Sequence, residues 1–534
     1  MADSPATNVS PHPIPWEPRF NPWLIAIVVA MAAFMEVLDT SIANVALPHI
    51  AGNLGASNDE STWVLTSYLV SNAIILPISG WLAGVFGRKR FFLLCLLLFT
   101  ISSLLCGIAP SLGLLIVFRI IQGLGGGGLQ PMAQAILADS FPPQQRGMAF
   151  ALYGITAVMA PTIGPTLGGW ITDNYTWRWI FCINLPVGVL AMFLAYRMVE
   201  DPPYITRLQG AGIRVDYIGI ALLALGVGAL QVLLDKGQED DWFGSSFVVA
   251  LALVAAVCLV ALVFWEWRQK QPVVDVRLFK NYNFAVANLM MFTLGVVLFS
   301  SVVMLPQFLQ TLMGYTAQSA GLVLSASGVV ILFQMPVVGQ LTTRVPAKYI
   351  IGVGWLMLTG GLYFAAAHLN LQISLESAVK LRVVQAFGIG FLFVPISLVG
   401  YLGIQPEKSS SVSGMINFMR NIGSSVGTSM VTTLLWRRSQ FHQTALSYHT
   451  TGFDPAFQSQ VNGLSRQLTH AGVSAADAQL QAYGRLYRSL EAQSQTLAYI
   501  DTFMVLAIAA GVMFLLTFIV RKNDPSAGGA VVVE

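Results

Sequence analysis

Apolar residues in this chain gather in long runs without charges, and residues 91–108 and 247–265 are clear examples. A run near 20 residues matches the hydrocarbon core of a bilayer, so each run predicts a helix that crosses a membrane. The pattern predicts about 14 spans, and therefore an all-α polytopic membrane protein. The expected spans are 23–47, 61–84, 91–109, 113–137, 147–171, 178–198, 216–235, 245–267, 283–311, 317–340, 349–368, 379–402, 410–436 and 499–520.

The composition supports the same class of protein. Of 534 residues, 55% are hydrophobic and only 10% are charged, whereas a soluble domain carries about 25% charged residues. The net charge of +3 gives no indication of nucleic-acid binding. The four cysteines lie in predicted spans, where we expect them to pack as small apolar side chains. No phosphate loop, nucleophile elbow or zinc spacing occurs, so we expect no enzyme, cofactor or metal site.

One polar motif occurs twice along the chain. Residues 119–128 read RIIQGLGGGG and residues 382–390 read RVVQAFGIG. Arg119 and Arg382 are therefore separated by 382 − 119 = 263 residues, and further glycines and prolines keep this offset. A repeat of this length predicts two related membrane halves that face each other, as in secondary transporters.

The repeat divides the chain into two six-helix halves with two further spans inserted between them. The expected segments are an N-terminal tail (1–22), a first half (23–198), a linker with the inserted spans (199–282), a second half (283–520) and a C-terminal tail (521–534).

The distribution of charge in the loops predicts the orientation. Lys and Arg are concentrated in alternate short loops, so both tails are expected in the cytoplasm. Residues 439–495 then form one long polar external loop, within which 475–495 could fold as an amphipathic helix. We expect this loop either to contact a partner or to be a solvated cap, with His442 in solvent.

The duplicated arginines are the first candidates for function. An arginine at bilayer depth costs at least roughly 2.5–3.5 kcal/mol on insertion scales, so Arg119 and Arg382 are functional hypotheses by default. Gln122 and Gln385 follow them at equal spacing. The alternative for each arginine is a hydrogen-bond anchor between helices.

The first span carries two acids. Glu36 and Asp39 are three residues apart and share one helix face with Asn44. Two carboxylates near the middle of a membrane cannot both be ionised cheaply, so at least one is expected to exchange a proton near neutral pH. The alternative makes Asp39 a cap or an interhelix hydrogen bond.

Small residues mark two further places. Span 2 ends in GWLAGVFGRKR at 80–90, where small residues allow close helix packing and a basic cluster anchors the helix end. The candidates there are Gly80, Gly87, Arg88 and Lys89. Span 5 contains APTIGPTLGGW at 160–170, which predicts a bendable, closely packed helix surface. Its candidates are Gly164, Pro165, Gly168 and Gly169.

Four motifs together resemble the 14-span drug:proton antiporters of the major facilitator superfamily, the EmrB type of multidrug permease. They are LDTSIANVALP at 38–48, RIIQGLGGGG at 119–128, GPTLGG at 164–169 and WRWIFCINLP at 177–186. The resemblance implies proton-driven export of small, mostly apolar compounds across the inner membrane by alternating access. It also implies Asp39 as the acid of span 1, Arg119 as a proton-relay arginine and Gly164-Pro165 as an antiporter signature. A periplasmic adaptor and an outer-membrane channel are the implied partners.

Two positions depart from the family pattern. Gly84 occupies the slot after span 2 where an acid is usual, which puts the usual cytoplasmic gate contact in doubt. Glu36 adds a second acid to span 1, which leaves the proton stoichiometry open. Two other functions stay open on this fold: a proton-coupled symporter that imports a nutrient, and a membrane receptor or structural protein that transports nothing.

Overall fold

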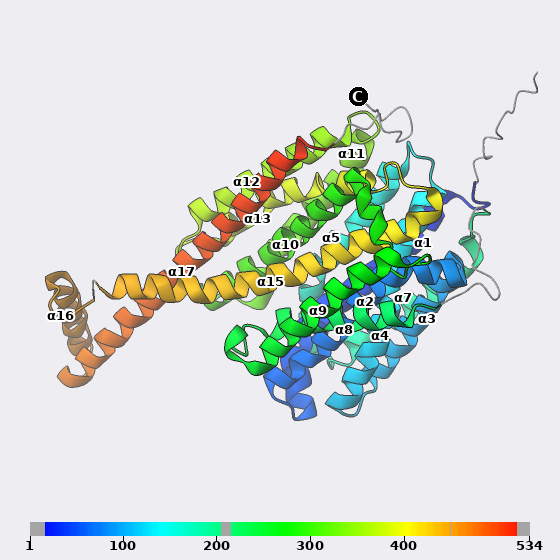
Figure 1. Ribbon diagram of the computed structural model, residues 1–534. Coiled ribbons are helices and arrows are strands. Elements are labelled where there is room, and N and C mark those ends of the chain that lie inside the picture. Colours follow the sequence, from blue (N-terminus) through cyan, green and yellow to red (C-terminus); the bar gives the residue numbers. More distant parts are fainter. Residues whose placement is uncertain (1–16, 204–214, 449, 521–534) are drawn as a thin grey trace, which may run out of the picture.

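The computed structural model describes residues 17–203, 215–448 and 450–520, and this part of the chain is helical and contains no strand (Figure 1). The expected tails 1–22 and 521–534 lie largely outside the described residues, as does 204–214 of the linker. The first half contains α1 (Pro22–Leu54), α2 (Asn58–Phe86), α3 (Arg88–Gly107), α4 (Leu112–Ser140), α5 (Arg146–Asn174), α6 (Trp179–Cys182) and α7 (Asn184–Met198). The remaining elements are α8 (Tyr217–Lys236), η2 (Trp242–Gly244), α9 (Ser246–Arg268), η3 (Val276–Lys280), α10 (Tyr282–Thr311), α11 (Ala317–Leu341), α12 (Ala347–His368), α13 (Leu375–Gly390), α14 (Phe393–Gly400), η4 (Pro406–Lys408), α15 (Ser409–Ser447), α16 (Pro455–His470) and α17 (Ala475–Thr517).

The predicted fold class is confirmed. Among the described residues, thirteen helical segments are long and apolar enough to cross a membrane, with α6–α7 and α13–α14 each counted as one. The expected span 410–436 falls in α15, which is too polar to be counted with them. Its first half is rich in Ser and Asn because that face is buried against α10, α2 and α4 rather than lipid. α15 is therefore an interior helix of the bundle.

The two halves pack on each other mainly through two helix pairs, α5 with α11 and α2 with α15, and also through α4 with α15 and α5 with α14. Small residues lie at both crossings. Gly80 on α2 faces Ser411 on α15, and Gly147 on α5 faces Thr342 next to α11. Both crossings lie near Arg88 and Arg146, at the end of the bundle that we call the basic end. Side chains at those glycines would prevent this approach of the halves.

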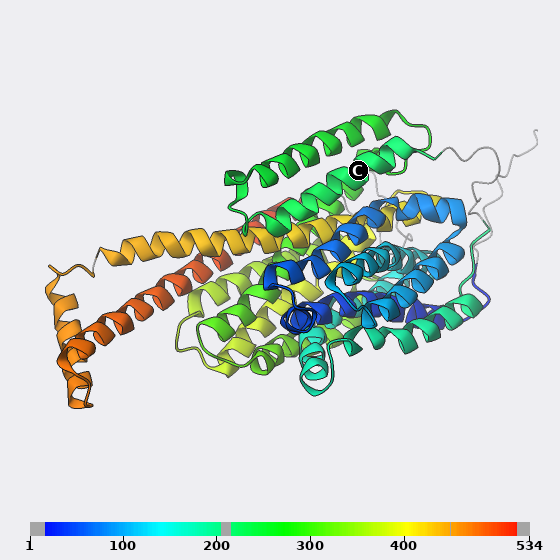
Figure 2. The ribbon, with the colours of Figure 1, turned by 90° about the horizontal axis from the view of Figure 1, so that it is seen from below.

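The inserted pair α8 and α9 lies along one side of the bundle (Figure 2). α8 contacts both halves. Its Gln231 amide donates to the Ser425 hydroxyl of α15 at 2.8 Å, while Asp235 accepts from Thr66 of α2. The pair therefore bridges the α2–α15 side of the molecule.

The segment 439–495, expected as a long external loop, is helical over most of its described residues. α15 and α17 continue as helices beyond the bundle and α16 lies at their tip, so these residues form a projecting arm (Figures 1 and 2). Residues 475–495 do fold as a helix, the first half of α17. A small apolar cluster of Val461, Leu468, Ala478 and Ala482 holds α16 against α17. The hydropathy pattern did not predict the helices of the arm, because a helix that does not cross a membrane needs no long apolar run.

His442 is also placed differently from the prediction. It is half-buried rather than solvated, and its Nε2 lies 2.7 Å from Asp501 of α17. Arg438 donates to the same carboxylate oxygen at 2.6 Å. These contacts tie α15 to α17 at the base of the arm.

Candidate functional site

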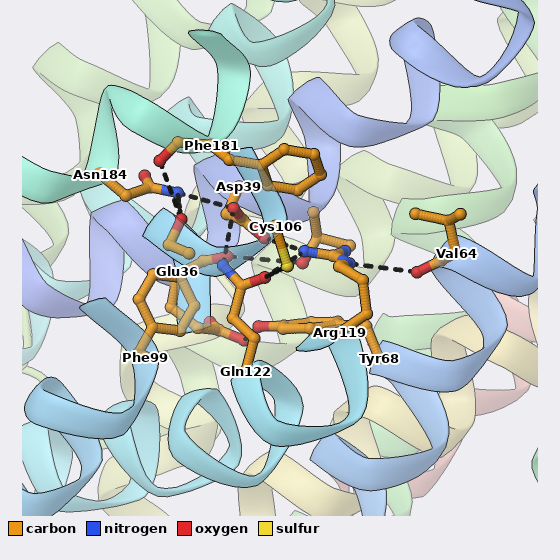
Figure 3. Close-up of polar contacts among 12 residues, drawn as sticks. Glu36, Asp39, Val64, Tyr68, Phe99, Cys106, Arg119, Gln122, Phe181 and Asn184 are labelled. Atoms are coloured by element: carbon orange, nitrogen blue, oxygen red, sulfur yellow. Dashed lines mark hydrogen bonds and ion pairs between the residues drawn. The ribbon is translucent and has the colours of Figure 1, made fainter. Parts of the chain in front are cut away.

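Asp39 and Arg119 form a fully buried ion pair inside the first half (Figure 3). Arg119 Nη1 lies 2.5 Å from Asp39 Oδ2, and its Nε donates to the Val64 carbonyl at 3.1 Å. Gln122 connects the two, because its Oε1 accepts from Arg119 at 2.9 Å and its Nε2 donates to Asp39 at 3.0 Å. Two residues of the duplicated motif on α4, Arg119 and Gln122, thus both donate to the carboxylate of Asp39 on α1.

A further residue completes the shell of Asp39. Asn184, at the start of α7, donates to Asp39 Oδ1 at 2.6 Å and to Ser103 at 3.0 Å. Sequence reasoning missed Asn184, although it lies within the WRWIFCINLP motif; nothing in the pattern indicated which residue of that motif turns inward. With Arg119, Gln122 and Asn184 all donating, the site is built to hold a carboxylate.

The glycine run of α4 makes this geometry possible. A Cβ at Gly127 would lie 2.6 Å from the Asn72 carbonyl of α2, and one at Gly125 would lie 2.7 Å from the Phe99 amide of α3. Real side chains do not fit at those distances. The glycines therefore let α4 lie against α2 and α3 at close range. This packing places Arg119 beside Asp39. It also places the Arg119 guanidinium 4.2 Å from the centroid of the Tyr68 ring.

Glu36 belongs to a different network from Asp39. Its Oε1 accepts from Tyr68 and Asn72 of α2, each at 2.9 Å, and its Oε2 accepts from Gln130 of α4 at 2.5 Å. Both acids are buried, as expected for one interior face of α1. The expectation that Asn44 shares that face was wrong, because its side chain is exposed.

Arg382 repeats the position of Arg119 but not its chemistry. It is equally buried, and its partners are the Ser327 hydroxyl at 3.3 Å, the Ser301 hydroxyl at 2.9 Å and the Gln385 amide oxygen at 3.2 Å. Ser327 follows Val64 by the repeat offset of 263, so the two arginines contact equivalent places with different groups. None of these partners of Arg382 is a carboxylate.

Two glycines of the α5 motif, Gly164 and Gly168, face α1. A Cβ at Gly164 would overlap Ser41, and one at Gly168 would lie 3.1 Å from Ile42. Pro165 has no N–H to donate to the Pro161 carbonyl, and the Ser41 hydroxyl donates to that oxygen at 3.3 Å instead. Gly169 has open space around it, so it does not share this packing role.

The motif after α2 lies at the basic end, where the halves meet. Arg88 pairs with Asp139 at the end of α4 and donates to the Pro406 carbonyl of the second half at 3.2 Å. The Lys89 backbone amide donates to Asp201 at 2.7 Å, and Gly87 adopts a positive φ of 86° where α2 turns into α3. Asp139 thus supplies an acid to this motif although Gly84 carries none.

In the described part of the chain, no three His, Cys, Asp or Glu side chains lie together in a way that would hold a metal ion.

Comparisons with known proteins agree with this architecture. The family model "Major Facilitator Superfamily" matches residues 29–428. The chain is 39% identical to "Multidrug export protein EmrB" of Haemophilus influenzae, over 86% of this chain and 88% of that protein. It is 34% identical to "Fatty acid resistance protein FarB" of Neisseria gonorrhoeae, over 95% of this chain and 97% of that protein.

A solved structure carries the same fold at low sequence identity. The proton:xylose symporter XylE superposes with a TM-score of 0.58 at 13% identity, covering 94% of this chain and 97% of that one. Because the chain matches the family model over most of its length and shares more than a third of its residues with a curated member, it belongs to the major facilitator superfamily.

Proposed function

We propose that this protein is a proton-coupled antiporter that exports small, mostly apolar compounds by alternating access. The observation that carries the proposal is the buried Asp39–Arg119 pair, in a chain more than a third identical to multidrug export proteins. Its relatives are transporters, and we propose no enzymatic activity and no cofactor.

Asp39 is the proposed proton carrier. Arg119, Gln122 and Asn184 all donate to its carboxylate, and we propose that protonation of Asp39 accompanies the movement of these donors away from it. Protonation removes the charge that holds Arg119 and frees α1 and α4 to shift. When Asp39 and Arg119 form their ion pair again, the proton is released on the other side of the membrane. Proton entry is thereby coupled to the rocking of the halves.

The two halves are proposed to be the moving bodies, with 23–198 and 283–520 enclosing a substrate site near the middle of the membrane. The packing of α1 on α5 at Gly164 and Gly168 gives a close, nearly smooth contact along which α1 can slide. The hydrogen bond from Arg88 to the Pro406 carbonyl connects the halves at the basic end, and the pairing of Arg88 with Asp139 holds Arg88 in place for it. We propose that the inserted α8–α9 pair closes the side between α2 and α15.

The protein is proposed to lie in the inner membrane with both termini in the cytoplasm. Arg88, Lys89, Arg146 and Lys408 share the basic end, and an excess of Lys and Arg marks the cytoplasmic face. The arm then projects into the periplasm. We propose that it contacts a periplasmic adaptor that leads to an outer-membrane channel; its exposed Phe441, Tyr448 and Tyr487 offer aromatic side chains of the kind that anchor interfaces.

Reconstitution in proteoliposomes tests the direction of transport. With substrate and proton gradients set independently, an antiporter moves protons opposite to substrate, whereas a symporter moves both the same way. Substrate-driven proton movement in the same direction as substrate would replace the proposal with nutrient import. The absence of any movement, with Asp39 freely replaceable, would favour a receptor or structural role.

A further inference from the structure

A chain of hydrogen bonds leads from Glu36 in the first half to α15 in the second. The side-chain amide of Gln130 lies in the middle of it. Its Nε2 donates to Glu36 Oε2 at 2.5 Å, and its Oε1 accepts from Arg420 of α15 and from the Tyr153 hydroxyl at 3.1 Å. That hydroxyl is also 3.1 Å from Asn417 Oδ1, again on α15.

The strength of the bond between Gln130 and Glu36 depends on the charge of Glu36. A carboxylate only accepts, so an ionised Glu36 requires Gln130 to present its NH₂ group to α1. The amide oxygen must then face Arg420, which only donates. A protonated Glu36 loses the charge that strengthens the bond from the Gln130 NH₂ group, so Gln130 is held less firmly in the position from which its oxygen accepts from Arg420.

From this geometry we propose that Gln130 is a positioning residue which transmits the protonation state of Glu36 to Arg420, and thereby to the contact between the two halves. The proposal deepens the proposed antiport function and rests on it. It gives Glu36 a task distinct from that of Asp39: the ionised form favours closure at the α4–α15 crossing, and the protonated form loosens it.

The surroundings of Glu36 leave few other groups to act on its proton. Tyr68 faces it from α2 and donates to the same carboxylate. Arg119 of α4 is bound to Asp39, and Tyr153 of α5 reaches Glu36 only through Gln130. Arg420 of α15 is the nearest cation along the chain of bonds, and its guanidinium also lies 5.5 Å from the Phe393 ring centroid.

Gln134, one turn further along α4, provides a matched control. It also spans the interface, because its Oε1 accepts from Asn417 at 2.9 Å, and it is equally buried. None of the hydrogen bonds given for Gln134 involves Glu36. A Gln134→Leu variant therefore weakens the crossing by a similar amount without touching the proposed relay.

The test measures the distance between the halves at the basic end as a function of pH. Nitroxide labels on Arg90→Cys and Glu407→Cys, both at exposed positions, report that distance by pulsed electron resonance in a background without the native cysteines. The labelled protein with Glu36 and Gln130 unaltered should show a longer distance between the labels at pH 5.5 than at pH 8. Glu36→Gln should give the longer distance at both pH values, and Gln130→Leu should remove at least half of the pH response.

Gln134→Leu should keep the pH response even if it lengthens the distance throughout. A full pH response in Gln130→Leu, or an equal loss in Gln134→Leu, overturns the relay. The experiment distinguishes failure of the relay from failure of the proposed function. Asp39→Asn should keep the pH response of the distance. A labelled protein that transports no substrate can still show this pH response. Arg420→Lys should restore part of the response that Arg420→Leu loses, since lysine also donates to the Gln130 oxygen.

Discussion

Asp39 and Arg119 lie 80 positions apart in the chain, yet their side chains meet at 2.5 Å in the interior of the first half. The second half has an arginine at the repeated position, but hydroxyl and amide groups surround it. The duplicated motif therefore lies in two different surroundings: a carboxylate contacts Arg119, whereas hydroxyl and amide oxygens contact Arg382.

The two acids of α1 should differ in their effect when neutralised. Asp39→Asn keeps the shape of the side chain and an acceptor oxygen but removes the charge that binds Arg119, so resistance of cells to toxic compounds should fall at least tenfold. Glu36→Gln should instead change the pH dependence of transport. Immunoblots of membrane fractions control for protein level. Full resistance in the double variant would exclude proton coupling through α1.

Substitution of the duplicated arginines by lysine should separate coupling from packing. Arg119 uses different guanidinium nitrogens for Val64 and for Asp39, and lysine cannot reproduce this fork. Arg119→Lys should therefore reduce transport at least tenfold. Arg382→Lys should reduce it less than threefold, because hydroxyl partners adapt more readily than a carboxylate in a fixed shell. Equal losses at equal protein level would contradict this division.

Two glycines of α5 form a matched pair for the packing of α1. Gly164→Ala places a methyl group against Ser41, and overpacking of this kind typically costs about 1–3 kcal/mol. It should lower both the thermal midpoint in detergent and the transport rate. Gly169→Ala meets open space and should change neither by a measurable amount. If both variants behave like the unaltered protein, close packing at Gly164 is not required.

The arm should be dispensable for transport itself but required in cells. Replacement of residues 439–495 by a short polar linker leaves the Asp39–Arg119 site untouched, so dye transport in proteoliposomes should continue. Whole-cell resistance should fall if an adaptor binds the arm. A pull-down from cross-linked membranes supplies the second readout. If the deletion variant keeps both whole-cell resistance and adaptor capture, the arm does not bind an adaptor and only covers the transporter.

The sequence was sufficient for the features that depend on local composition. Run length located the spans, and the cost of a buried arginine indicated Arg119 before any partner was known. The repeat offset also showed that Gln122 and Gln385 follow their arginines at equal spacing, and in the structure both accept a hydrogen bond from them.

Features that depend on tertiary packing were not predictable in the same way. Asn184, Gln130 and Arg420 are polar residues whose partners lie on other helices, and only the assembled bundle determines which side chain each one reaches. The arm was missed for a related reason. Its helices pack on each other through the four-residue cluster around Val461, which has no long apolar run to reveal it.

The proposed role of Asp39 is tested most directly by comparing two kinds of transport in the same proteoliposomes. Asp39→Asn should lose all accumulation driven by a proton gradient, because no proton can be carried. It should retain exchange of labelled for unlabelled substrate, since exchange needs binding and rocking but no net proton movement. Gradient-driven accumulation by Asp39→Asn at the rate of the unaltered protein would contradict the assignment of Asp39 as the proton carrier.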